Sequence, residues 1–186
     1  PAMGCQYFDP CDHGADTFTI AIPKVTFGRG CLAEAGARAQ GLGMTRVGLF
    51  TDAALRQGPY FATVMDSLHA AGLDVAVFDE ITIEADDASV VRGAAFIADG
   101  NFDGVVSLGG GSVMDTAKAS MLYGLHPVAD FLDYFAPPLG AGKPIPSDLL
   151  PHLACPTTSG TGSECTSISV LRINDLKTKF VLANPA

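Results

Sequence analysis

The sequence predicts an α/β protein in which a mostly parallel β-sheet is covered by helices on both faces. Short apolar runs, typical of buried parallel strands, alternate with longer segments whose apolar residues recur every three or four positions. Hydrophobic residues make up 48% of the 186 residues and charged residues 17%, which is enough apolar material for a packed core. Strands that alternate with helices in this way are typical of a doubly wound, Rossmann-like fold.

The individual elements follow in chain order from the same patterns. Residues 1–16 mix Pro, Asp, Gly and Cys without periodicity, so we expect an N-terminal arm ahead of a single domain over residues 17–186. Two β-prone runs, residues 17–22 and 24–27, open that domain. Residues 126–151, rich in Pro, Gly and Asp, are predicted to form a long surface excursion. The other predicted strands are 47–52, 75–78, 105–108 and 153–155. Three predicted helices are 32–42, 60–71 and 114–124. A further predicted helix is capped by Asp87 or Ser89 and closed by Gly100.

Charge and cysteine content exclude several classes of function. The chain carries 11 Lys and Arg against 20 Asp and Glu, a net charge of −9, which argues against a nucleic-acid or acidic-membrane surface. No apolar run approaches the ~18–20 residues that span a bilayer, and the first residues lack the pattern of a signal peptide. The five cysteines show no C-x-x-C spacing, so a cytoplasmic, reducing compartment is favoured over a disulfide framework.

A glycine turn, residues 109–111, lies directly between a predicted strand and a predicted helix. Residues without a Cβ let the backbone approach an anion, and a helix that begins at Ser112 offers unpaired N–H groups and the positive end of its dipole. Asp115 follows three residues later, a variant of the capping box. The turn therefore suits a phosphate or pyrophosphate. The alternative is a glycine-rich turn without a ligand, since neither G-x-G-x-x-G nor a Walker loop is present.

A hydroxyl loop, residues 156–164 (PTTSGTGSE), follows the end of another predicted strand. Five hydroxyl groups and two glycines in nine residues can present donors and backbone to a polar ligand. A solvated Ser/Thr loop is the alternative. Because both clusters leave the carboxyl ends of strands in one parallel sheet, we expect them to converge on a crevice of the kind that binds ligands in open α/β sheets.

Together, GGGSVMDTAK at 109–118 and the hydroxyl loop strongly resemble the N-terminal half of the iron-containing (group III) alcohol dehydrogenases, over roughly residues 17–186. The stretch DFLDY at 130–134, with GKP at 142–144, is most similar to the hydroxyacid–oxoacid transhydrogenase branch. The resemblance implies a dehydroquinate synthase-like dinucleotide-binding domain over residues 17–186 and a homodimer. It also implies iron or zinc held by one Asp and three His of a helical C-terminal domain that is absent from this chain, so no metal ligand is expected here.

The resemblance also implies roles for particular residues. Asp52, at the end of a strand, would accept hydrogen bonds from the adenosine ribose, and a carboxylate there favours NAD over NADP. The residues expected to hold the pyrophosphate and the neighbouring ribose are Gly109, Gly110, Gly111, Ser112 and Asp115. The residues expected near the nicotinamide and the rest of the cofactor are Thr157, Thr158, Thr161, Thr166 and Lys179.

One segment departs from the family pattern, and the cysteines and histidines are not expected to be catalytic residues or metal ligands. Residues 83–86 read IEAD where the family often has Pro-Asn-Pro, so an Asn contact to the cofactor is lost or replaced. Cys155 and Cys165 flank the hydroxyl loop and are expected to be buried structural thiols. The four histidines form no ligand cluster: His13, His69, His126 and His152.

The function that these residues imply is the NAD-binding half of a metal-dependent oxidoreductase. Such an enzyme transfers hydride between a small-molecule alcohol or hydroxyacid and the nicotinamide, and we expect the 186-residue chain alone to be inactive. Two alternatives stay open: a relative of glycerol dehydrogenase or dehydroquinate synthase, and a non-catalytic dinucleotide-binding module. For a transhydrogenase relative, the mitochondrion is the alternative compartment. The sequence specifies neither the substrate nor iron against zinc.

Overall fold

The computed structural model describes residues 23–183, which form four parallel strands, four α-helices and a separate β-hairpin. The strands are β1 (Arg46–Phe50), β2 (Asp74–Phe78), β3 (Gly104–Gly109), β4 (His152–Pro156), β5 (Ile168–Ile173) and β6 (Thr178–Ala183). The helices are α1 (Ala35–Gly41), α2 (Pro59–Ala70), α3 (Asp87–Gly100) and α4 (Gly111–Leu125). Short 3-10 turns lie at η1 (Cys31–Glu34), η2 (Leu55–Gln57), η3 (Phe131–Tyr134) and η4 (Ser163–Cys165).

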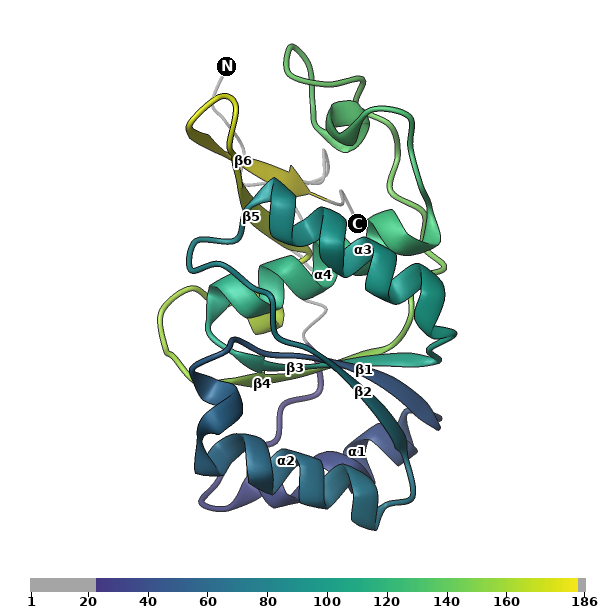
Figure 1. Ribbon diagram of the computed structural model, residues 1–186, viewed down its shortest axis with the longest axis vertical. Coiled ribbons are helices and arrows are strands. Elements are labelled where there is room, and N and C mark those ends of the chain that lie inside the picture. The colour runs from purple at the N-terminus through teal and green to yellow at the C-terminus, as the bar shows by residue number, and fades with distance from the viewer. Residues whose placement is uncertain (1–22, 184–186) are drawn as a thin grey trace, which may run out of the picture.

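The sheet has the strand order β2-β1-β3-β4, and all of its neighbouring strands are parallel. Val47 of β1 pairs with Val75 on one side and with Gly104 on the other. Figure 1 shows α1 and α2 on one face of the sheet and α3 and α4 on the opposite face. These features confirm the predicted α/β fold with a mostly parallel, doubly wound sheet.

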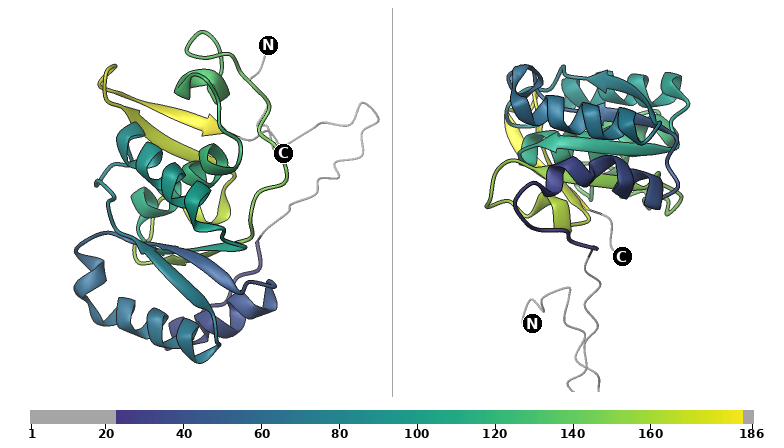
Figure 2. Two further views of the ribbon diagram at one scale, coloured as in Figure 1. Left: turned by 45° about the vertical axis from the view of Figure 1, so that its right-hand side comes forward. Right: turned by 90° about the horizontal axis from the view of Figure 1, so that it is seen from below.

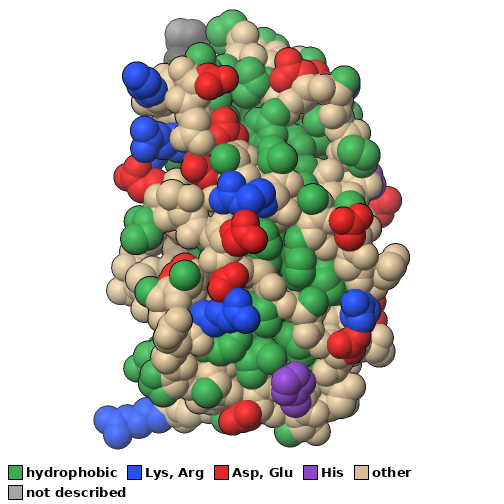
Figure 3. Space-filling model, viewed as in Figure 1, with side chains coloured by type: hydrophobic (Ala, Val, Ile, Leu, Met, Phe, Trp, Pro, Cys, Tyr) green, Lys and Arg blue, Asp and Glu red, His purple; other side chains and the backbone are tan. Residues whose placement is uncertain are grey.

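The core is divided by the sheet. On the α1 and α2 side, Val47, Leu49 and Val106 pack against Val64 and Leu68 of α2, and all five are buried. On the α3 and α4 side the buried residues include Phe50, Phe78, Ile97 and Met121. Every residue of β3 is buried, because helices cover it on both faces. On the face drawn in Figure 3, basic side chains lie beside acidic ones.

Helix α3 is capped one residue before the first of the two predicted positions, and it ends at Gly100 as predicted. Asp86, rather than Asp87 or Ser89, caps the helix, and its carboxylate accepts the backbone N–H of Ser89 at 2.8 Å. Asn101, which follows Gly100, adopts the left-handed conformation with φ +49° and ends the helix.

The predicted strand at residues 24–27 is wrong. Residues 23–27 form no strand, and in the part of the chain that the structure describes no strand lies beside them. Val25 is 67% exposed and Phe27 98% exposed, because nothing in the described chain covers them. β-prone side chains alone do not make a strand without a partner for the backbone. The other β-prone run, residues 17–22, lies outside the described residues.

The segment 126–151 is more than a surface excursion. Its 3-10 turn η3 presents Tyr134, and the next residue is Phe135; both are buried. The ring of Phe131 stacks on Tyr123 of α4 with ring centroids 4.5 Å apart. The segment therefore adds apolar side chains to a third core cluster, on the side of α4 away from the sheet.

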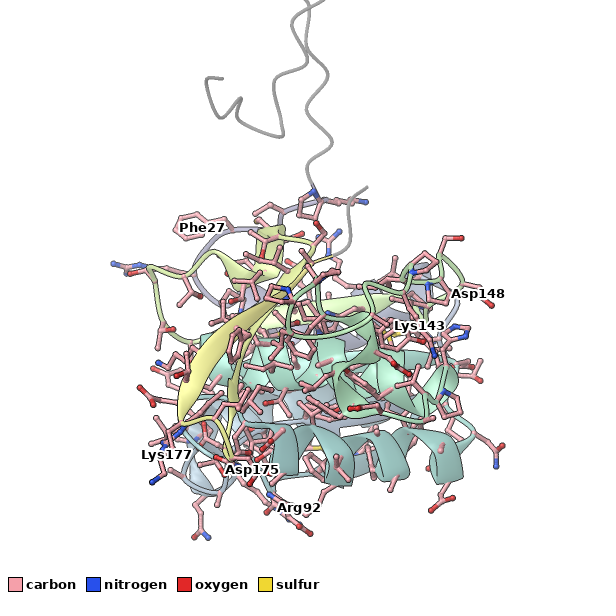
Figure 4. The ribbon with its side chains drawn as sticks, turned by 90° about the horizontal axis from the view of Figure 1, so that it is seen from above. Phe27, Arg92, Lys143, Asp148, Asp175 and Lys177 are labelled. Carbon is pink, nitrogen blue, oxygen red and sulfur yellow. The ribbon has the colours of Figure 1, made fainter. Side chains whose placement is uncertain are left out.

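Strands β5 and β6 form an antiparallel hairpin outside the parallel sheet. The hairpin lies on the side of α4 away from the sheet, so α4 is enclosed by two layers (Figures 1 and 2). The hairpin tip, marked by Asp175 and Lys177, lies beside the start of α3 in Figure 4. There Asn174 Nδ2 donates to Asp87 Oδ1 at 2.6 Å and joins the tip to the helix.

Candidate functional site

The glycine turn and the hydroxyl loop lie side by side at the carboxyl end of the sheet. β3 and β4 pair in register, with Gly109 opposite Pro156, so the two clusters leave the sheet as neighbours (Figure 1). The backbone N–H of Thr157 donates to the carbonyl oxygen of Gly109 at 2.9 Å. The structure thus brings together two clusters that are separated by more than forty residues of sequence, as the parallel-sheet argument predicts.

The glycine turn needs glycine because other groups approach it closely, not because of its backbone dihedrals. Gly110 has φ −81°, a value open to any residue. A Cβ on Gly111 would lie 2.8 Å from Cγ2 of Thr161, and a Cβ on Gly110 would lie 3.1 Å from Oγ1 of Thr158. A Cβ on Gly109 would overlap the side chain of Val113. The two threonines expected near the cofactor therefore sit directly over the turn.

Helix α4 begins at this turn, but its start differs from the predicted capping box. Gly110 is the N-cap, and its carbonyl oxygen accepts the N–H groups of Val113 and Met114. The hydroxyl of Ser112 instead accepts the backbone N–H of Glu84 at 3.0 Å. The first N–H groups of this 15-residue helix lack partners within the helix, and its dipole adds partial positive charge beside the hydroxyl loop. This helix start is suited to an anion.

Asp115 is buried inside the fold rather than turned toward the glycine turn. It is 6% exposed, and its Oδ2 accepts the backbone N–H of Val170 on β5 at 3.0 Å. Its other oxygen lies 3.2 Å from Nζ of Lys118. The expected contact of Asp115 with the cofactor stays a prediction, and the geometry favours a role in holding the hairpin.

Lys118 is a functional residue that the sequence argument missed. Its ammonium donates to the carbonyl oxygens of Ser163 at 2.9 Å, Thr166 at 3.3 Å and Ile168. Burial lowers the pKa of this ammonium, while the neighbouring Asp115 acts in the opposite direction. A half-buried lysine on α4 therefore anchors the end of the hydroxyl loop and the start of β5. The one signal in the sequence was its place three residues after Asp115, on the same helix face.

The threonines of the hydroxyl loop are exposed, whereas Asp52 is half-buried and already accepts backbone hydrogen bonds. Thr157, Thr158 and Thr161 are exposed, which leaves their hydroxyls accessible. Asp52 lies two residues beyond β1, at the same end of the sheet as the glycine turn. Its Oδ1 accepts the N–H groups of Ala54 at 3.0 Å and Leu55 at 2.8 Å and so fixes the turn that follows the strand. The contact of Asp52 with a ribose stays a prediction.

Lys179 reaches the same region from the hairpin. Its Nζ lies 2.9 Å from Oε1 of Glu84, and both side chains are about half exposed. The ammonium of Lys179 holds the pKa of the Glu84 carboxyl below its usual range. Thr166, by contrast, enters the site through its backbone, since its carbonyl oxygen accepts from Lys118.

The histidines and cysteines near the sheet have no catalytic arrangement. His152 Nε2 lies 2.8 Å from Oγ of the buried Ser107, and burial together with the charge of Lys118 lowers the pKa of His152 to about 4. Burial raises the pKa of Cys155 to about 11, so its thiol stays protonated at neutral pH. Cys165 lies on the surface at the end of η4, so the expectation that it is buried is wrong.

Residues 23–183 contain neither a cluster of metal ligands nor a membrane-spanning helix. This range contains no group of three or more His, Cys, Asp and Glu residues that could hold a metal ion. No helix within it is both long enough and apolar enough to cross a bilayer.

Comparison with known proteins gives consistent matches. The family model for iron-containing alcohol dehydrogenase matches residues 23–186. Mitochondrial hydroxyacid-oxoacid transhydrogenase of Mus musculus is 41% identical over 178 residues, which cover 95% of this chain and 38% of that protein. This chain therefore spans little more than a third of the length of that relative. These matches confirm the resemblance drawn from the two motifs.

Solved structures show the same similarity in three dimensions. A 1,3-propanediol oxidoreductase superposes with a TM-score of 0.77 and 31% identity, covering 91% of this chain and 43% of its own. Sulfoacetaldehyde reductase from Bifidobacterium kashiwanohense, solved in complex with NAD+, gives a TM-score of 0.78 and 30% identity, covering 90% and 43%. The similarity thus covers the part of those enzymes that corresponds to the α/β domain described here.

Proposed function

This chain belongs to the iron-containing alcohol dehydrogenase family, and we propose that it is the NAD-binding half of a metal-dependent oxidoreductase. The complete enzyme would transfer hydride between a small-molecule alcohol or hydroxyacid and the nicotinamide. The similarity to hydroxyacid-oxoacid transhydrogenase favours a hydroxyacid over a simple alcohol and over a substrate of the glycerol dehydrogenase type. The dinucleotide-binding domain would extend over residues 17–186.

The observation that carries this proposal is the contact between the glycine turn and the hydroxyl loop at the start of α4. Gly110, Gly111 and the first N–H groups of α4 would bind the pyrophosphate, because side chains are absent there and the helix dipole is favourable. The threonine hydroxyls of the loop would orient the nicotinamide side. Bound NAD would supply the carbon that accepts hydride, while these residues place it and keep it oriented.

Asp52 would set the preference between the two common nicotinamide cofactors. Its Oδ1 is used by the turn that follows β1, which fixes the carboxylate at the carboxyl end of the sheet. A carboxylate beside the adenosine ribose accepts hydrogen bonds from free hydroxyls and repels a 2′-phosphate. We therefore expect NAD to bind more tightly than NADP.

The metal of this family finds no matching donor set in the described residues. Because residues 23–183 hold no group of three or more His, Cys, Asp and Glu residues that could bind it, we assign these residues cofactor binding only. The divalent iron or zinc of the complete enzyme would take ligands outside this range. The similarity to mitochondrial hydroxyacid-oxoacid transhydrogenases favours the mitochondrion over the cytoplasm as the compartment. We also propose a homodimer, which sedimentation would detect.

Calorimetric titration of the 186-residue chain with NAD and NADP tests the proposal. We expect NAD to bind and Gly111→Ala to weaken it by about tenfold, equivalent to roughly 1.4 kcal/mol, because the new Cβ displaces Thr161 from the turn. Gly41→Ala is the matched control, since nothing lies within 4 Å of the added Cβ. Failure of the wild-type chain to bind either nucleotide would overturn the assignment.

A further inference from the structure

Glu84 contacts two of the residues that are proposed to bind the cofactor. It lies in the segment between β2 and α3, where the sequence departs from the family pattern. Its backbone N–H donates to Oγ of Ser112, at the start of α4, and its carboxylate pairs with Lys179 on β6. The backbone N–H and the side-chain carboxylate of Glu84 thus both contact residues of the proposed nucleotide site.

The conformation of Glu84 is costly and is held from both sides. Its φ of +66° lies in the left-handed region, which a residue with a side chain seldom adopts. The next residue, Ala85, accepts the backbone N–H of Arg172 at 2.8 Å, and Asp86 caps α3. Surrounding contacts that keep a residue in such a conformation are a recurrent mark of functional positions.

The pairing changes what Lys179 can recognise. Lys179 lowers the pKa of Glu84, so the carboxylate is charged at neutral pH, and Arg172 also lies near enough to favour the charged form. An ammonium compensated by a carboxylate keeps N–H groups for a neutral hydroxyl, but its attraction for a further phosphate is reduced. Without Glu84, Lys179 would act as a point charge that attracts phosphate.

We propose that Glu84 is a specificity-determining residue, which reserves Lys179 for a ribose hydroxyl and disfavours nucleotides that end in a free phosphate. This inference rests on the proposed NAD site. NAD and ADP share the adenosine and the diphosphate. They differ where NAD continues into a second ribose and ADP ends in a phosphate with additional negative charge. Glu84 repels that charge beside Lys179, and so lowers the affinity for ADP relative to the affinity for NAD.

Calorimetric titrations of NAD and ADP into wild-type protein and variants test this role. In Glu84→Gln we expect ADP to bind about three- to fivefold more tightly, the size typical of an exposed charge interaction, while NAD changes less. Glu80→Gln is the control, because it removes the same charge from the same segment, from an acid that pairs with Arg92. Glu84→Asp retains the charge and should keep the wild-type ratio of the two affinities.

Variants of Lys179 keep the test decisive if Glu84→Gln folds poorly. Lys179→Met should weaken NAD more than ADP, and in combination with Glu84→Gln it should abolish the gain in ADP affinity. If Glu84→Gln alters the ratio no more than Glu80→Gln, or if Lys179→Met affects both ligands equally, the inference is wrong and the proposed function still stands. If the wild-type chain binds neither nucleotide, the proposed function fails and this inference fails with it.

Discussion

The two sides of the candidate site are built in different ways. The glycine turn and α4 form a packed wall, in which β3 is buried throughout and the helix is enclosed by the sheet and the hairpin. The hydroxyl loop forms a tethered wall. Its threonines are exposed, its first residues are held by the backbone of Thr157, and its far end is held by the ammonium of Lys118. Apolar packing fixes one wall and a few polar contacts fix the other, so stability and site geometry can be perturbed separately.

The core beneath the packed wall should show the largest loss of stability. Phe50 is fully buried beneath α3 and α4 and contacts the rings of Phe78 and Phe96. We expect Phe50→Ala to lower the free energy of unfolding by about 3–5 kcal/mol, measured by denaturant unfolding, because it leaves a cavity. Phe27→Ala, at a side chain that is 98% exposed, should change it by less than about 0.5 kcal/mol. Equal effects of the two substitutions would contradict the described core.

Lys118→Met tests the tethered wall. The substitution leaves the carboxylate of Asp115 without its cation and removes a donor from three carbonyl oxygens. We expect a loss of about 2–4 kcal/mol in unfolding free energy and a weakening of NAD binding by at least about tenfold. Binding by the folded protein is measured by calorimetry, with Lys118→Arg as a partial rescue. Unchanged NAD affinity in Lys118→Met would show that the loop keeps its geometry without this anchor.

The half-buried His152 should make stability depend on pH. Its pKa is about 4 in the folded protein against an ordinary value of 6.5, so the unfolded chain binds the proton more readily. Stability is therefore retained above pH 6.5 and falls as the pH decreases toward 4, by roughly 2–3 kcal/mol in total. Unfolding measured across this range should show the slope in the wild type and lose most of it in His152→Gln. The same slope in both proteins would show that groups other than His152 cause the pH dependence.

Asp52 should give the smallest change in stability and a change in ligand preference. Asp52→Ala removes the acceptor of two backbone N–H groups, which costs about 1 kcal/mol by analogy with helix caps. If the carboxylate also faces the adenosine ribose, the variant should bind NAD less tightly and discriminate less against NADP. Competition titrations with both nucleotides measure the ratio. If the ratio of NAD affinity to NADP affinity equals that of the wild type, the role of Asp52 is limited to stabilising the turn after β1.

Sequence patterns predicted the packed wall better than the tethered wall. The parallel strands and α2 to α4 are marked by local apolar periodicity, and the glycine turn by its position between two of them. Lys118 escaped prediction because its partners are backbone carbonyls 45 to 50 residues away, which no side-chain pattern marks. Residues 24–27 show the opposite error, since a β-prone composition cannot tell whether a neighbouring strand is present. The start of α4 was misassigned because Ser112 bonds to Glu84, a contact that depends on the fold.

The enclosure of α4 between two layers has a consequence for the energetics of recognition. A helix that is already immobilised on both sides loses little conformational entropy when a ligand settles at its first turn. The affinity gained from its amide groups is then not offset by the cost of ordering the helix. Any ordering that accompanies binding of the proposed nucleotide would then fall on the exposed threonines opposite.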